Sequence, residues 1–306
     1  MSQETKKVWV SDVIGDTYKE WKPGDFVCID AGTGTGKSHF VRNELYDACN
    51  AGQRILFISN RNKLKEQIRH AIKGKEDTIT IINYQAIESK MIRGEKLDFD
   101  MFDYVVCDEC HYFLTDASYN KNNDLSLSAV LEIKNSVVMF MTATGKSFFK
   151  FINDEYKAKR KIHTYRIPRD YSRIKQLFFF EEDDSLEQFI AKEVKDNEKV
   201  LYFCNNVKKL YELSRKYNDS LFIFSDPFEE GKNGNYVKKK TAKAGNNDKY
   251  AKYLDREAIQ EVIETKALNR KFTFTTTTLD NGVDLYGKDL KWIVIDDIRD
   301  FDTMIQ

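Results

Sequence analysis

The sequence lacks an excess of either charge sign and lacks any long apolar run. Lysine plus arginine and aspartate plus glutamate both number 49 in 306 residues, so the formal net charge is zero. This balance excludes a positive field over the whole chain, and contact with nucleic acid has to come from local patches. The chain also has no apolar run of about 18 residues, and residues 1–7 have no apolar segment behind them. We therefore expect no signal peptide, no membrane span and no membrane partner.

Cysteine is also scarce, because only five are present, an odd number for a chain of this size. This count favours a reducing compartment over a disulfide framework, so we expect a cytoplasmic protein. Cys107 and Cys110 form one Cys-x-x-Cys pair, whereas a zinc site of that kind needs a second pair. The other three cysteines are scattered over apolar segments, and we expect neither zinc binding nor a redox role.

The most informative segment present is Ala31-Gly-Thr-Gly-Thr-Gly-Lys-Ser, which lies between an apolar run at 25–30 and a helical pattern at 39–46. Strand, glycine-rich loop and helix form the context of a phosphate-binding loop, although Ala31 replaces its usual first glycine. The glycines let main-chain N–H groups turn toward phosphate oxygens, and the start of the helix adds a positive dipole end. The predicted nucleotide-binding residues of this loop are Gly32, Thr33, Gly34, Thr35, Gly36, Lys37 and Ser38.

Two side chains of the loop and two carboxylates farther along have predicted roles in ATP chemistry. We expect Lys37 to reach the β- and γ-phosphates and the Ser38 hydroxyl to bind Mg²⁺. The apolar run 104–108 ends in Asp108-Glu109. Asp108 at the strand tip is expected to hold Mg²⁺, and Glu109 to orient and deprotonate the attacking water. Both motifs follow strands, and ligand sites in parallel sheets lie at the carboxyl ends of strands.

Apolar runs alternate with helical patterns along the whole chain, which predicts two doubly wound α/β domains, over 1–168 and 169–306. The runs are nearly continuous, as is typical of strands buried on both faces of a parallel sheet. Predicted strands of the first domain lie at 25–30, 54–59, 78–83, 104–108 and 136–142, with helices at 38–50, 61–74 and 125–134. Predicted strands of the second domain lie at 176–180, 200–204, 221–224, 272–276 and 291–295, with helices at 185–196, 207–217 and 254–267.

Two segments interrupt this alternation. The charged segment 145–172 is interpreted as the passage between the domains, and 226–253 as a mobile loop or small insertion. The run Lys238–Lys240 inside the insertion fits either a solvated face or a grip on a phosphate backbone. The Phe178–Phe180 triplet favours a buried strand over a platform for stacking bases.

The motifs in their order resemble those of the superfamily 2 DEAD/DEAH-box helicases, in a variant that reads Asp108-Glu-Cys-His111. The loop 31–38 is similar to motif I, 108–111 to motif II, and Thr142-Ala-Thr144 to motif III. Weaker likenesses are those of 59–61 to motif Ia, 202–205 to motif IV and 275–284 to motif V. Near motif Ib, Tyr84 fits either that motif or core packing.

The resemblance implies two RecA-like domains with ATP between them and a strand of nucleic acid across both. It implies that His111, Thr142 and Thr144 couple the nucleotide state to domain closure. It also implies a place for Arg61 at the nucleic-acid face. For the second domain, it assigns the cleft wall to Gly282 and Asp284, and motif IV to Asn205. The partner is expected to be a single-stranded tract of DNA or RNA, and no protein partner is indicated.

Two departures from the family pattern affect the expected activity. The upstream glutamine motif of DEAD-box RNA helicases is not evident, which argues against a strict member of that group. The sequence stops at Gln306, where motif VI with its arginines begins. Because an arginine finger contributes about 10³–10⁵ in turnover, we expect an incomplete second domain that leaves ATP bound but poorly hydrolysed. The alternatives are a double-stranded DNA translocase of restriction type and a hydrolysis-deficient, ATP-dependent nucleic-acid-binding module.

Overall fold

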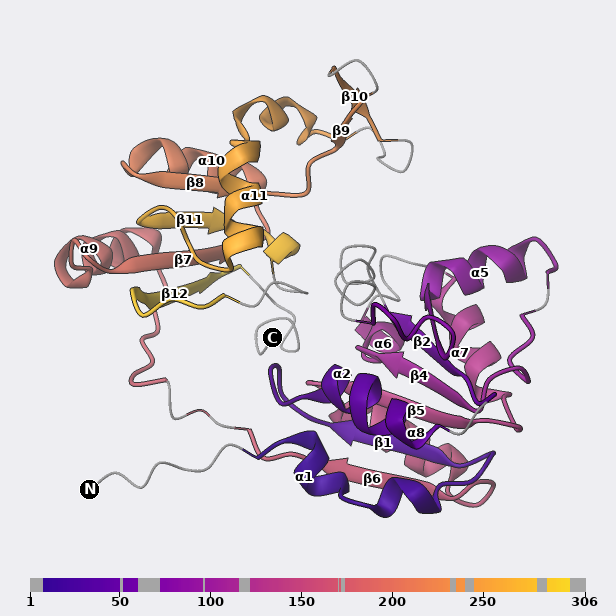
Figure 1. Cartoon of the computed structure of the whole chain (residues 1–306). Coiled ribbons are helices and arrows are strands. Elements are labelled where there is room, and N and C mark those ends of the chain that lie inside the picture. Colours follow the sequence, from indigo (N-terminus) through magenta and orange to yellow (C-terminus); the bar gives the residue numbers. More distant parts are fainter. Residues whose placement is uncertain are drawn as a thin grey trace, which may run out of the picture. The chain divides into compact units, whose positions relative to one another are not determined.

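The chain divides into two compact units, Met1–Ile174 and Lys175–Gln306 (Figure 1). The computed structural model describes residues 8–49, 52–59, 72–95, 97–115, 122–169, 171, 174–231, 235–239, 245–279 and 285–297. Within those ranges, none of the helices combines the length and the apolar character that crossing a bilayer requires.

The first unit is built on a six-stranded sheet in the order β3-β2-β4-β5-β1-β6 (Figure 1). Every neighbouring pair in this sheet is parallel. The strands are β1 (Phe26–Asp30), β2 (Ile55–Ser59), β3 (Ile79–Asn83), β4 (Tyr104–Asp108), β5 (Val137–Thr142) and β6 (Ile162–Arg166). The first five begin within one residue of the predicted apolar runs; four of them are buried on both faces, and the edge strand β3 is partly buried.

Helices cover both faces of this sheet, as a doubly wound fold requires. Side chains alternate along β1, so that Phe26 and Cys28 join one core and Val27 and Ile29 the other. The first core packs against α5 (Tyr84–Ile92), α6 (Tyr112–Thr115), α7 (Asn123–Leu131) and α8 (Lys146–Tyr156). The second packs against α1 (Val10–Ile14), α2 (Lys37–Phe40) and its π-helical continuation η2 (Val41–Leu45). The short elements η1 (Thr17–Glu20) and α3 (Tyr46–Ala48) complete the described part of this layer.

The interpretation of 145–172 as a passage between domains is wrong for most of that segment. It forms α8 and β6, which belong to the first unit, and β6 pairs with β1 along its whole length. Phe148 and Ile152 of α8 are fully buried in the first core. The charged residues of the segment lie on the exposed face of α8 and on an edge strand, where water solvates them.

The second unit is built on a four-stranded parallel sheet in the order β12-β7-β11-β8. Its strands are β7 (Lys199–Cys204), β8 (Ser220–Ile223), β11 (Phe272–Thr275) and β12 (Leu290–Asp296). The helices α9 (Asp183–Glu193) and α10 (Val207–Lys216) pack on one face, and α11 (Arg256–Thr265) on the other. A short 3₁₀ turn, η5 (Thr277–Leu279), follows β11.

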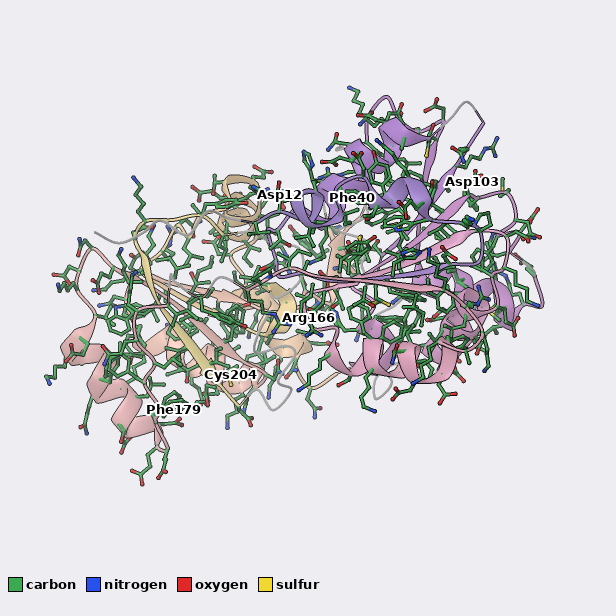
Figure 2. The ribbon with its side chains drawn as sticks, turned by 90° about the horizontal axis from the view of Figure 1, so that it is seen from below. Asp12, Phe40, Asp103, Arg166, Phe179 and Cys204 are labelled. Atoms are coloured by element: carbon green, nitrogen blue, oxygen red, sulfur yellow. The ribbon has the colours of Figure 1, made fainter. Side chains whose placement is uncertain are left out.

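The Phe178–Phe180 triplet does not form the predicted buried strand. Residues 174–180 have no regular secondary structure, and the Phe179 side chain is 93% exposed (Figure 2). Phe178 is half-exposed and packs against Phe189, with ring centroids 4.7 Å apart. An apolar triplet is therefore not sufficient for a strand where no neighbouring strand pairs with it.

The insertion 226–253 carries structure of its own. A short antiparallel hairpin, β9 (Phe228–Glu230) and β10 (Tyr236–Lys238), is followed by the 3₁₀ helix η4 (Asp248–Tyr253) (Figure 1). Arg256 fixes the base of the hairpin, because its guanidinium lies 4.0 Å from the centre of the Tyr236 ring and 2.7 Å from an Asp226 carboxylate oxygen. Lys238 forms an ion pair with Asp248. At least one lysine of the run Lys238–Lys240 therefore forms an ion pair within the insertion itself.

Candidate nucleotide-binding site

The segment between β1 and α2 is folded as a tight loop around its own lysine. Gly34 and Gly36 have φ angles of 66° and 90°, which lie in the left-handed region that favours glycine. The Lys37 ammonium donates to the carbonyl of Ala31 at 2.9 Å and to that of Gly32 at 3.3 Å. Lys37 is only 7% exposed. The loop therefore holds a buried positive charge at the carboxyl end of β1.

Neighbouring elements anchor the loop from both sides. The Ala31 N–H donates to the Thr142 carbonyl at 3.0 Å, which joins the loop to the end of β5. On the other side, the Val10 N–H donates to the Thr35 carbonyl at 2.9 Å. The Trp9 ring packs against Gly36, where an added Cβ atom would lie 3.2 Å from a ring carbon. Sequence reasoning missed this contact of Trp9, because no local pattern indicates a contact between segments so far apart.

Asp108 ends β4 and is buried, with 3% of its surface exposed. Its Oδ1 atom has no hydrogen-bond partner among the described residues. Burial and the negative charge of Glu109 raise the pKa of Asp108 to about 7, while the charge of Lys37 acts in the opposite direction. A buried carboxylate oxygen without a hydrogen-bond partner lowers the stability of the fold, and a ligand that binds to this oxygen removes the penalty.

Glu109 differs sharply from its neighbour. Burial opposes ionisation here too, but the charge of Lys37 and the contacts with His111 and Thr142 outweigh burial and lower the pKa of Glu109 to about 2. The backbone of Glu109 is left-handed, with φ of 50°. Glu109 is therefore an ionised carboxylate on a strained turn, directly after a carboxyl group that titrates near neutrality.

The hydroxyl of Thr142 joins the Asp108 motif to the end of β5. Thr142 Oγ1 lies 2.8 Å from His111 Nδ1 and donates to Glu109 Oε2 at 3.4 Å. It also accepts the Thr144 N–H at 3.1 Å. The Thr142 hydroxyl has one proton and donates it in the hydrogen bond to Glu109. The hydrogen bond between Thr142 and His111 therefore requires that Nδ1 of the imidazole carries a proton and donates it. The structure thus brings together the predicted residues of motifs II and III.

The remaining predicted residues lie apart from this hydrogen-bonded cluster or outside the described part of the chain. Ser38 is half-buried at the second position of α2, and its carbonyl accepts a hydrogen bond from Arg42 Nε at 2.9 Å. Sequence reasoning missed Arg42, whose charge interacts with Asp108; its position one helical turn after Ser38 was the available signal. Asn205 is exposed after the end of β7 in the second unit. Three predicted residues lie outside the described part of the chain: Arg61, Gly282 and Asp284.

A divalent ion fits the chemistry of this site only together with other ligands. In the described ranges, no group of three or more His, Cys, Asp or Glu side chains is placed to hold a metal. Mg²⁺ is usually bound through one or two carboxylates plus substrate phosphates, so this is no obstacle to it. The free Oδ1 atom of Asp108 and the Ser38 hydroxyl supply the oxygen ligands that such a site needs from the protein.

One family model and several solved structures are similar to this chain. The family model described as "Type III restriction enzyme, res subunit" matches residues 69–147, which contain β3, β4 and β5. The fold is similar to S. cerevisiae Dbp5 bound to RNA and ADP BeF3, at 15% identity and a TM-score of 0.59, over 92% of this chain and 74% of that one. It is also similar to the DEAD-box helicase Mss116 bound to ssRNA and UDP-BeF, at 14% identity and a TM-score of 0.53, over 90% of this chain and 61% of that one.

These matches show a likeness in sequence over residues 69–147 and a likeness in fold over most of the chain. The predicted fold class is confirmed, since the chain has two RecA-like α/β units, each built on a parallel sheet. Comparison with curated protein sequences gives no match.

Proposed function

We propose that the chain is an ATP-dependent nucleic-acid motor of helicase type. ATP binding would close its two domains on a strand of DNA or RNA, and hydrolysis would reopen them. The observation that carries the proposal is the buried cluster of Lys37, Asp108 and Glu109 with Thr142, at the carboxyl ends of β1, β4 and β5. Parallel sheets bind ligands at this edge.

Each group in the cluster has a role in this reaction. The loop N–H groups and Lys37 bind the β- and γ-phosphates, and Ser38 with Asp108 would hold Mg²⁺. The ion, when bound, neutralises phosphate charge that develops during transfer. Glu109 is ionised at neutral pH, so it accepts a hydrogen bond from the attacking water and orients it. His111 and Thr144 both contact Thr142, which also contacts Glu109. A change in the hydrogen bonding of Glu109 would therefore also affect these two residues, through Thr142 at the end of β5.

The test is ATP hydrolysis with and without single-stranded DNA or RNA. Lys37→Ala is expected to lower nucleic-acid-stimulated hydrolysis by at least ~10²-fold, because the buried charge proposed to bind the phosphates is lost. The matched control is Lys150→Ala, since Lys150 is exposed on α8 and pairs with Asp154 on the same helix. Hydrolysis that survives in the Lys37→Ala variant contradicts the site assignment. Tight ATP binding without turnover, both in this chain and in a longer one that carries motif VI, favours the binding module instead.

A second candidate, a motor that moves along double-stranded DNA without parting the strands, is favoured by the match to the restriction-enzyme family model. Two assays with the same protein separate the candidates. A helicase displaces one strand of a partial duplex, whereas a duplex translocase displaces the third strand of a triplex and leaves the duplex intact. ATP-dependent triplex displacement without strand displacement favours this second candidate.

A further inference from the structure

Tyr84 lies at the junction of β3 and α5, and its side chain reaches the Asp108 motif at the end of β4, two strands away in the sheet. It is the first residue of α5 and is fully buried. Its hydroxyl donates to the main-chain carbonyl of Asp108 at 2.9 Å. In the sheet order β3-β2-β4, strand β2 stands between the two partners. Because neighbouring strands lie about 4.8 Å apart, the tyrosine side chain crosses the end of β2 to reach β4.

The accepting carbonyl belongs to the peptide group that joins Asp108 to Glu109. Rotating this peptide changes ψ of Asp108 and φ of Glu109 together, and so moves both carboxylates. Glu109 has φ of 50°, a conformation that non-glycine residues adopt only when their surroundings hold them in it. The Tyr84 hydroxyl is placed to supply that restraint, because it fixes the carbonyl of this peptide.

The Tyr84 ring is itself held in place on two sides. It stacks on Tyr112, with ring centroids 4.7 Å apart and an angle of 12° between the planes, and meets Phe113 edge-on at 4.9 Å. The Tyr112 hydroxyl donates to the buried Glu88 carboxylate at 2.8 Å, and Ser126 donates to the same oxygen at 2.9 Å. Because α5, α6 and α7 all contribute to this cluster, the hydroxyl of Tyr84 is directed at one position.

We propose that Tyr84 is a positioning residue for the carboxylates of the Asp108 motif, setting their geometry for Mg²⁺ and water through the peptide between them. The proposal rests on the proposed function, because it assigns a support to that same site. It also gives the β3–α5 junction a direct connection to the nucleotide site, beyond its contribution to core packing.

The test compares Tyr84→Phe with Tyr112→Phe. Each variant keeps its ring in the stacked pair and loses one buried hydroxyl, but only the first hydroxyl contacts the Asp108–Glu109 peptide. Binding of a fluorescent ATP analogue is titrated with Mg²⁺, at a temperature below the melting transition of both variants. We expect the half-saturating Mg²⁺ concentration to rise about tenfold in Tyr84→Phe and to stay within about twofold of the parent in Tyr112→Phe.

Equal Mg²⁺ requirements in the two variants overturn the proposal, because a purely structural hydroxyl would act alike in both positions. If the parent chain binds the analogue normally, such a result leaves the proposed function intact. If the parent chain binds no analogue at any Mg²⁺ concentration, the proposed function fails, and the role of Tyr84 fails with it.

Discussion

At the residue scale, two adjacent carboxyl groups have been given opposite ionisation behaviour by their surroundings. Asp108 is buried, one of its carboxylate oxygens has no hydrogen-bond partner in the described structure, and its pKa rises. Glu109 lies one residue later, in reach of Lys37, His111 and Thr142, and its pKa falls. Separated pKa values of this kind are typical of functional sites, where neighbouring acids need different protonation states.

This difference predicts how stability depends on pH. The pKa of Asp108 is raised from 3.8 to about 7, so the folded chain holds a proton that the unfolded chain has released. Stability conferred by that proton is present at low pH and is lost as the pH rises through this window. Asp108→Asn carries no charge and escapes the loss. We expect the variant to gain on the parent between about pH 5 and pH 8, reaching ~1–3 kcal/mol in the free energy of unfolding.

The measurement is urea unfolding of parent and variant at both pH values, without Mg²⁺ or nucleotide. Asp154→Asn is the control, because Asp154 is exposed and its pKa is lowered by the hydrogen bond and the charge of Lys150. Its titration lies below the tested window, so its difference from the parent should stay constant. An Asp108→Asn difference that is also constant between the two pH values contradicts the assigned ionisation of Asp108.

At the element scale, the conformation of the phosphate loop depends on glycine in two distinct ways. Gly36 needs a left-handed backbone, and it also lies against the Trp9 ring. Gly52 has the same backbone requirement, with φ of 93°, but an added Cβ atom would meet nothing within 4 Å. The two positions therefore separate backbone strain from steric displacement of the loop.

Alanine at either position is expected to lower the free energy of unfolding by about 1 kcal/mol, the usual cost of a left-handed non-glycine residue. Only Gly36→Ala is expected to weaken binding of an ATP analogue, by roughly tenfold or more, because the loop has to move away from Trp9. Titration of the analogue and urea unfolding of both variants provide the check. An unchanged affinity in Gly36→Ala shows that the loop does not contact the phosphates as assigned.

The elements that sequence predicted well are those whose patterns are local. The strands β1, β2, β4 and β5 are buried on both faces, and β3 still has three isoleucines in five residues, so all five apolar runs are visible without knowledge of their neighbours. The strand β6 lies outside the predicted strands because its sequence, Ile-His-Thr-Tyr-Arg, has no continuous apolar run and is only partly buried. The triplet Phe178–Phe180 misled for the opposite reason, since apolar composition alone does not provide a partner strand.

The same distinction applies to the site. Lys37 and Asp108 were predictable because each lies in a contiguous motif whose spacing follows from its chemistry. Trp9 and Tyr84 were not assigned to the site, because their contacts join residues far apart in the chain. Such contacts depend on strand order, and the order β3-β2-β4-β5-β1-β6 was not part of the prediction.

At the scale of the whole molecule, each unit has its own pair of hydrophobic cores. The buried residues of the first two cores end at Ile167, and those of the other two begin at Leu186. The described contacts of the phosphate loop and of the Asp108 motif all lie within Met1–Ile174. Nucleotide binding and nucleic-acid stimulation should therefore be separable by cutting the chain between the units.

A fragment of residues 1–174 is expected to unfold cooperatively, because a domain of this size buries enough surface to fold alone. We expect it to bind an ATP analogue with Mg²⁺ within about threefold of the whole chain, since the cut removes none of the contacts above. Nucleic-acid-stimulated hydrolysis should be lost, because the proposed motor closes two domains on the strand.

Lys37→Ala in the fragment is the control for specific binding. If the folded fragment binds the analogue tenfold more weakly than the whole chain, residues beyond Ile174 contribute to the nucleotide site. If it keeps full stimulation by nucleic acid, closure of two domains is not how the chain couples ATP to its partner.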